Sequence, residues 1–269
     1  MDNISKVKKE SIEEFSSQPT QERYKKIADE GLWESEKILI SKYFKPNSNI
    51  LDIGCGSGRI AFPLYEIGFK VTGVDITPKM IETAKKVSLS KRMNIDFLTG
   101  DATNLNFKDD YFDGTIFANN GWAQIPGKEN RQKALNEIYR VLKPGRFFIL
   151  TAHQRYYSGS YLFLWIKNWI KFYLLKPLGF NIKEIDFGDL FFERNYKIGG
   201  ISPRQFIHCA GGKEVEAQVI KSGFKLEMKK GMGKLSQEDA NFMRGSLSKD
   251  FNSLKSPVFY VCLKSIYIS

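Results

Sequence analysis

A short apolar run that ends in an acid and then in glycines at alternate positions constrains this chain more than any other feature. Residues 50–58 read Ile-Leu-Asp-Ile-Gly-Cys-Gly-Ser-Gly, with Asp52 just ahead of Gly54. Such a stretch predicts a buried strand, a tight turn and a ligand that approaches the backbone too closely for a Cβ atom. A dinucleotide-binding turn would place a glycine where Arg59 stands, and an anionic pyrophosphate would be repelled by a carboxylate at the strand end. The turn therefore favours a cationic nucleoside over NAD.

Further apolar segments repeat the pattern of a strand followed by a polar tip. Residues 70–75 end in Asp75, about 20 residues beyond the glycine turn, where the next strand of a βαβ unit presents a carboxylate to ribose hydroxyls. The strands predicted after it cover residues 95–102, 111–120 and 142–151, and the last of these is entered through a Pro-Gly turn. Helices are predicted between the strands, at residues 59–67, 77–86 and 130–142. This alternation predicts a parallel sheet with helices on both faces.

These residues together resemble the class I S-adenosylmethionine-dependent methyltransferases, of the small-molecule, methyltransferase type 11-like kind. The D-x-G-x-G-x-G turn, Asp75, Gly-Asp-Ala at 100–102, Tyr-Phe-Asp at 111–113 and Leu-Lys-Pro-Gly at 142–145 follow one another in the family's order. The resemblance implies a Rossmann-like α/β fold with a mostly parallel seven-stranded sheet. It also implies a helical lid insertion after strand five and an antiparallel last strand, formed with a hairpin at residues 224–228 and 258–263.

The resemblance further implies how S-adenosylmethionine is held. The backbone of the turn would hold the methionine portion, and Asp75 would bind the ribose. Asp101 and the Ala102 amide would bind the adenine, and Ile76 would cover the adenine ring. Asn119 would lie below the sulfonium. Asp52 either caps the turn or contacts the cofactor directly. Asp113 is predicted to be structural, at the entrance of a strand. The predicted cofactor-binding residues are thus Gly54, Cys55, Gly56, Gly58, Asp75, Ile76, Asp101, Ala102 and Asn119.

A general base is needed only if the methyl acceptor must lose a proton, and His153, after the fifth strand, is the candidate for that role. A hydrogen-bonded structural histidine is the competing interpretation. Asn120 and Trp122 follow strand four and are predicted to border the acceptor. His208 is predicted at the start of a helix. With two histidines and no Cys-x-x-Cys motif in the chain, no metal is expected.

The whole chain, 1–269, is predicted to form one methyltransferase domain. Residues 1–20 are polar and are expected to be frayed at their start. The cofactor-binding core covers 20–153, where 21–44 should be helical in two pieces broken near Gly31. Residues 154–213 form a lid or substrate insertion, and 214–269 contribute a helix at 214–222 and the last strands.

Within the insertion, residues 161–176 predict a helix that is apolar or aromatic on nearly every side, with a narrow polar stripe that includes Lys167, Asn168 and Lys171. Three interpretations stay open. The helix is a lid over the active site, an oligomer interface, or a segment that touches a membrane surface through its Trp and Lys side chains.

Composition leaves the acceptor open. The net charge is +11, and residues 151–269 hold 18 basic and 10 acidic residues. Solvated lysines explain such an excess, as does attraction to an anionic surface or substrate. The leading prediction is therefore methyl transfer to a small, apolar or lipid-like molecule. One alternative is an RNA methyltransferase, although no RNA-binding module is recognisable and nucleic acid is not the expected partner. The other is a non-catalytic partner subunit that binds S-adenosylmethionine.

The expected location is the cytoplasm. Three cysteines without paired spacing predict a reducing compartment, and we expect neither a signal peptide nor a spanning helix.

Overall fold

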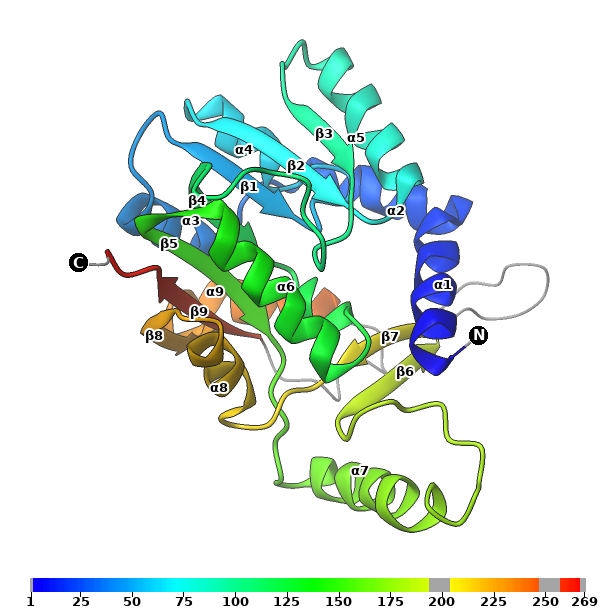
Figure 1. The fold of residues 1–269 in the computed structure, drawn as a ribbon. Helices are drawn as coiled ribbons and strands as arrows, with labels where there is room; N and C mark the ends of the chain where they lie inside the picture. The colour runs from blue at the N-terminus through cyan, green and yellow to red at the C-terminus, as the bar shows by residue number, and fades with distance from the viewer. Residues whose placement is uncertain (1, 194–203, 247–256, 267–269) are drawn as a thin grey trace.

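A seven-stranded sheet forms the centre of the computed structural model, which describes residues 2–193, 204–246 and 257–266 (Figure 1). Its strands lie in the spatial order β3-β2-β1-β4-β5-β9-β8. The first five run parallel, whereas β9 is antiparallel to both of its neighbours, as predicted. The strands are β1 (Asn49–Ile53), β2 (Lys70–Asp75), β3 (Asp96–Thr99), β4 (Phe112–Phe117), β5 (Leu142–Ala152), β8 (Lys225–Gly231) and β9 (Val258–Leu263).

The middle strands are apolar because both faces of the sheet are covered. In β1, Leu51 pairs with Thr72 of β2 and with Thr115 of β4, and it is fully buried. A short apolar run of this kind is what a parallel strand between two helical layers requires. The glycine turn therefore leaves the sheet at its centre, where β1 lies between β2 and β4.

Helices cover the two faces and create two hydrophobic cores. On one face, α6 and α8 bury Leu135, Ile138 and Val219, and on the other, α3, α4 and α5 bury residues such as Leu39 and Phe62. The predicted helices are confirmed, including the two pieces within 21–44. The helices around the sheet are α2 (Gln18–Ala28), α3 (Glu34–Tyr43), α4 (Ala61–Glu66), α5 (Pro78–Ser90), α6 (Lys128–Val141), α8 (Glu214–Lys221) and α9 (Gln237–Ser246), with short 3-10 turns η1 (Trp122–Gln124) and η3 (Met232–Lys234).

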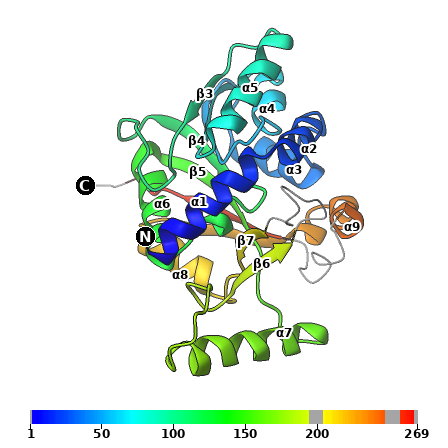
Figure 2. The same cartoon turned by 90° about the vertical axis from the view of Figure 1, so that its right-hand side faces the viewer.

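The start of the chain differs from its prediction. Residues expected to be frayed form helix α1 (Asn3–Ser16), which crosses in front of the sheet in Figure 2. Asp2 caps this helix, since its side chain accepts a hydrogen bond from the Ser5 amide at 2.7 Å. Burial of Val7 and the contacts of α1 with α2, α5 and β7 stabilise it against the body of the protein.

The insertion after β5 contains the predicted helix, as α7 (Ser160–Trp169) and the short π-helix η2 (Ile170–Leu175). It also contains a small antiparallel sheet that the sequence did not predict, β6 (Asp189–Glu193) with β7 (Arg204–His208). In Figure 1, α7 lies at the bottom, away from the large sheet. No helix in the described ranges combines the length and the apolar content needed to cross a bilayer.

Candidate functional site

The glycine turn joins β1 to α4 and is held by a carboxylate from the next strand. Asp75, the last residue of β2, accepts hydrogen bonds from the amides of Gly56 at 3.0 Å and of Thr77 at 2.8 Å. Gly58 has a φ of +97°, and an added Cβ atom there would lie 2.6 Å from a carbon of the Phe62 ring. Burial raises the pKa of Asp75, against the lowering effect of the two amides. Each carboxylate oxygen keeps a lone pair with which it can accept a ligand hydroxyl.

A cavity of about 300 Å³ opens at the carboxyl ends of the central strands. This edge is where ligands bind in open α/β sheets. The cavity brings together seven of the nine residues predicted to bind the cofactor: Gly54, Gly56, Asp75, Ile76, Asp101, Ala102 and Asn119. The other two lie outside it, since Cys55 lines a smaller cavity next to it, of about 30 Å³, and Gly58 lines neither.

Asp52 faces the smaller cavity, which shares Tyr24, Gly54, Gly56 and Asn119 with the larger one. Its side chain is buried, and its Oδ2 atom has no hydrogen-bond partner among the described residues. Burial raises the pKa of Asp52 to about 8, although the nearby Arg59 guanidinium opposes this shift. A buried carboxyl oxygen without a partner fits the amino group of a bound ligand, because an unsatisfied buried acceptor is unfavourable.

Helix α1 covers the larger cavity. Ile4, Lys8, Ile12 and Phe15 line it at helical spacing, so one face of α1 is directed into the site. The Lys8 ammonium forms an ion pair with Asp101. Although partial burial acts in the opposite direction, Lys8 and the Thr103 amide hold the pKa of Asp101 below its usual value. These lining residues were not predicted from the sequence, although the helical spacing of the apolar side chains in residues 4–15 indicates a buried face.

A buried ion pair supports the other side of the turn. The Arg59 guanidinium donates to both carboxylate oxygens of Glu36, each at 2.7 Å, and lies 4.3 Å from the centre of the Trp33 ring. A third hydrogen bond links Arg59 to the Gly31 carbonyl oxygen, at 2.9 Å. Arg59 therefore attaches the chain just beyond the glycine turn to the start of α3.

The residues predicted for the acceptor and for proton transfer lie beside the cavity rather than on its wall. Trp122 is fully buried in the core, with the Arg131 guanidinium 5.5 Å from its ring centre. Asn120 is buried, and its backbone N–H donates a hydrogen bond to the Thr151 hydroxyl oxygen at 3.0 Å. His153 is also buried and does not line the cavity. The titratable side chains that do line it, among the described residues, are Lys8, Tyr24, Asp75 and Asp101.

The described residues of the insertion do not line this cavity either, so the lid that the structure describes is α1. A lid role for residues 154–213 stays a prediction, and part of that range lies outside the described residues. Asp113 is structural as expected, since it accepts hydrogen bonds from the Asn49 amide and from Lys143.

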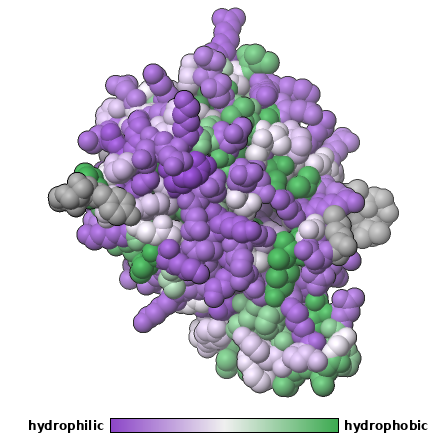
Figure 3. Space-filling view, viewed as in Figure 1, coloured by the Kyte–Doolittle hydropathy of each residue, from purple (hydrophilic) through white to green (hydrophobic). Residues whose placement is uncertain are grey.

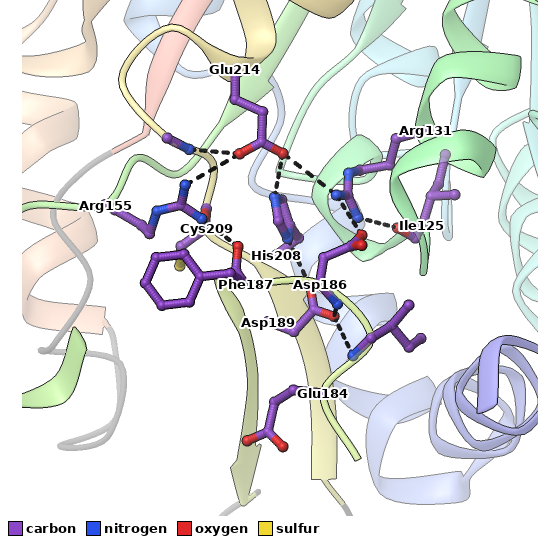
Figure 4. A network of polar contacts seen from close by, with 12 residues as sticks. Ile125, Arg131, Arg155, Glu184, Asp186, Phe187, Asp189, His208, Cys209 and Glu214 are labelled. Carbon is purple, nitrogen blue, oxygen red and sulfur yellow. Dashed lines mark hydrogen bonds and ion pairs between the residues drawn. The ribbon is translucent and has the colours of Figure 1, made fainter. Parts of the chain in front are cut away.

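A second polar cluster lies where the insertion meets the main sheet's helices (Figure 4). His208 was expected at a helix start but is the last residue of β7, and its ring nitrogens lie 2.7 Å from Asp189 and 2.8 Å from Glu214. Arg131 of α6 pairs with Asp186 at 2.9 Å and with Glu214 at 3.5 Å.

Burial would raise the pKa of Glu214, but His208, the Gly211 amide and Arg131 lower it to about 2. Asp186, Asp189 and His208 lie close enough together to consider a metal ion. However, Arg131 already neutralises Asp186, and Asp189 accepts the amides of Ile185 and Asp186. We therefore interpret this cluster as a structural anchor for β6 and β7.

Comparisons with known proteins agree with this geometry. Residues 50–145 match a family described as "Methyltransferase domain". A ubiquinone/menaquinone biosynthesis C-methyltransferase of Zymomonas mobilis is 36% identical over 130 residues, which are 48% of this chain and 52% of the relative. A demethylmenaquinone methyltransferase of Symbiobacterium thermophilum is 33% identical over 154 residues, 54% of this chain and 59% of the relative. The chain thus spans little more than half the length of these curated relatives.

Among solved structures, a SAM-dependent methyltransferase of Methanosarcina mazei aligns with a TM-score of 0.67 and covers 88% of this chain and 100% of that one. The two sequences are 21% identical, so the likeness is one of fold.

Proposed function

We propose that this chain, which belongs to the class I S-adenosylmethionine-dependent methyltransferases, transfers a methyl group from S-adenosylmethionine to a small, apolar acceptor molecule. The observation that carries the proposal is the cavity in which the glycine turn meets Asp75 and Asp101. S-adenosylmethionine supplies an activated methyl group on a sulfonium centre.

The residues around the cavity suit the parts of this cofactor. The turn at Gly54–Gly56 and the unpartnered Oδ2 of Asp52 would hold the methionine portion, whose amino group is cationic. Asp75 would accept hydrogen bonds from the ribose, as acids at the end of the second strand do in related α/β folds. Asp101 and Ala102 would receive the adenine. The carboxylates also favour a ligand with a positive charge.

The chain's own contribution to the reaction would be alignment and the exclusion of water. Methyl transfer is an in-line displacement, for which a positioned acceptor in a dry cavity supplies most of the rate enhancement. Side chains such as Ile4, Ile12, Phe117 and Ile125 supply the apolar wall. Since His153 does not line the cavity, we infer that the acceptor enters with its nucleophilic atom already able to react.

The apolar wall is also what favours a small apolar acceptor over RNA. One relative named above is called a ubiquinone/menaquinone biosynthesis C-methyltransferase and the other a demethylmenaquinone methyltransferase, which supports an apolar acceptor here as part of the proposal. The net charge of +11 is the observation that favours RNA. A nucleic-acid substrate would make binding fall steeply with salt, whereas an uncharged acceptor would not.

The first test is S-adenosylmethionine binding by isothermal titration calorimetry. We expect the wild-type chain to bind and Asp75→Asn to lose at least tenfold in affinity, because a charged acceptor of the ribose is removed. Asp96→Asn is the matched control, since Asp96 is exposed at the opposite end of a neighbouring strand. A wild-type chain that binds no S-adenosylmethionine would refute the proposal.

The second test follows methyl label from S-adenosylmethionine into a cell extract, with Asp75→Asn as the blank. Label in an organic-soluble small molecule supports the proposed acceptor class. Label in RNA refutes it.

A further inference from the structure

The outward face of α7 and η2 consists of large apolar side chains. Leu162, Phe163, Ile166, Trp169, Ile170, Tyr173 and Leu174 are all at least 40% exposed, and they recur at the spacing of one helical face. Phe163 is the most exposed of the seven, at 75%. In Figure 3, hydrophobic side chains gather at the lower end of the molecule, where α7 lies in Figure 1. We call these seven residues the α7 face.

The inward face of the same helix fixes its orientation. Trp165 is 2% exposed and lies against the Phe187 ring, with 6.2 Å between ring centres. Asn168 is also buried and donates a hydrogen bond to the Asp189 carbonyl oxygen at 3.2 Å. Asp189 belongs to the polar cluster with His208 described above. Packing of Trp165 and Asn168 against the insertion therefore fixes the orientation of α7 and leaves the α7 face directed outward.

The charge of the surrounding segment indicates what covers the α7 face. From Arg155 to Lys183 the chain contains five basic residues and no acidic one. Lys167 is exposed and forms no ion pair with a described residue, while Lys171 and Lys176 interact with the Glu184 region at the edge of the helix. An apolar face bordered by lysines, with Trp169 and Tyr173 on it, has the composition of helices that lie in the headgroup region of a membrane.

We propose that the α7 face docks on the surface of an anionic phospholipid bilayer, with α7 in the plane of the membrane. The apolar side chains enter the boundary between headgroups and acyl chains, and the lysines contact lipid phosphates. A second copy of this chain fits less well, because pairing two such faces would bring like charges together without an acidic partner. The proposal does not depend on the chemistry at the cofactor cavity.

Trp169 provides an intrinsic probe for this docking. It is 47% exposed, whereas Trp122 and Trp165 are buried and Trp33 is half-buried, so a change in Trp emission on vesicle addition reports mainly on α7. With vesicles of equal parts phosphatidylcholine and phosphatidylglycerol, we expect a blue shift and co-sedimentation of the protein. Both should weaken at high salt and be lost with pure phosphatidylcholine. Lys167→Glu should reduce partitioning at least about fivefold, the effect of one lysine charge near an anionic surface.

The double variant Phe163→Glu/Ile166→Glu should abolish vesicle binding and leave the thermal melting curve and S-adenosylmethionine binding unchanged. Leu89→Glu is the matched control, because Leu89 is 77% exposed on α5, in another part of the molecule. It should bind vesicles like the wild type.

Three results would overturn the proposal. The first is no binding to the anionic vesicles at low salt. The second is binding that persists in the double variant. The third is a wild-type dimer, seen by light scattering, that the double variant converts to a monomer while neither protein binds vesicles, which would assign the α7 face to self-association.

Discussion

Replacing Glu36 by glutamine should destabilise the protein strongly, although Glu36 does not line the cofactor cavity. The Glu36 side chain is fully buried, and it accepts two hydrogen bonds of 2.7 Å from Arg59 and one of 2.9 Å from the Trp33 amide. Glu36→Gln keeps the shape of the side chain but leaves the buried Arg59 guanidinium without its counter-charge. Removing one partner of a buried ion pair costs about 3–5 kcal/mol, because an uncompensated charge stays behind.

Urea denaturation followed by circular dichroism measures this loss in the free energy of unfolding. The matched control is Glu34→Gln, on the same helix, where Glu34 pairs with Lys37 and both side chains are more than half exposed. An exposed pair of this kind contributes about 0–1 kcal/mol. At roughly 2–4 °C of melting temperature for each kcal/mol, the two variants should differ by on the order of 10 °C.

A double variant separates charge from packing. Glu36→Leu combined with Arg59→Met removes both charges, and it should recover much of the stability that Glu36→Gln loses, since replacing a whole buried pair by apolar groups is often neutral. A stabilising role for the buried ion pair is contradicted if Glu36→Gln lowers the free energy of unfolding no more than Glu34→Gln does, or if the double variant is less stable than Glu36→Gln.

Three further predictions concern the cofactor cavity. Gly58→Ala should lower the free energy of unfolding, measured by urea denaturation, by about 1–3 kcal/mol, because the positive φ and the nearby Phe62 ring both disfavour a Cβ atom. The control Gly212→Ala should lower it much less, because a Cβ atom there would meet no neighbouring atom. Asp52 has a pKa of about 8 in the folded protein and 3.8 in the unfolded chain, so between these pH values the folded state binds more protons than the unfolded state. The free energy of unfolding should therefore fall as pH rises from about 4 to about 8. Asp52→Asn should lack this part of the pH dependence in unfolding titrations at pH 5 and pH 8, and an unchanged slope would contradict it. Lys8→Met should strengthen S-adenosylmethionine binding severalfold by releasing Asp101, and weaker binding in calorimetry would show that the ion pair helps to hold the cofactor.

The sequence predicted which residues meet at the carboxyl ends of the central strands because the relevant signals are local. A strand, a glycine turn and a second strand ending in Asp75 must come together when β1 and β2 pair in parallel, with Ile53 opposite Val74. Parallel pairing in a βαβ unit leaves few alternatives for where Asp75 lies. The same logic placed the five parallel strands, whereas the antiparallel β8 and β9 were predicted from the family resemblance.

The position of α1 over the cavity was not predicted because its contacts are non-local. Nothing near Lys8 in the sequence indicates that its partner is Asp101, and the polar composition of residues 1–20 hides the apolar spacing on one face of α1. Trp122 shows a related limit. Its place in the chain after β4 suggested contact with the acceptor, but packing against Arg131 buries it in the core.

The position of β9 has a consequence for how the chain folds as it is synthesised. β9 lies between β5 and β8. The backbone groups on this edge of β5, from Phe147 to Ala152, therefore have no strand partner until the ribosome has synthesised Val258–Leu263. Strand β8 likewise has no other described strand to pair with. An apolar edge left open in a nascent chain is a site of aggregation. Chains stalled before Val258 should therefore be the ones that engage chaperones most strongly, and the emergence of β9 should release them.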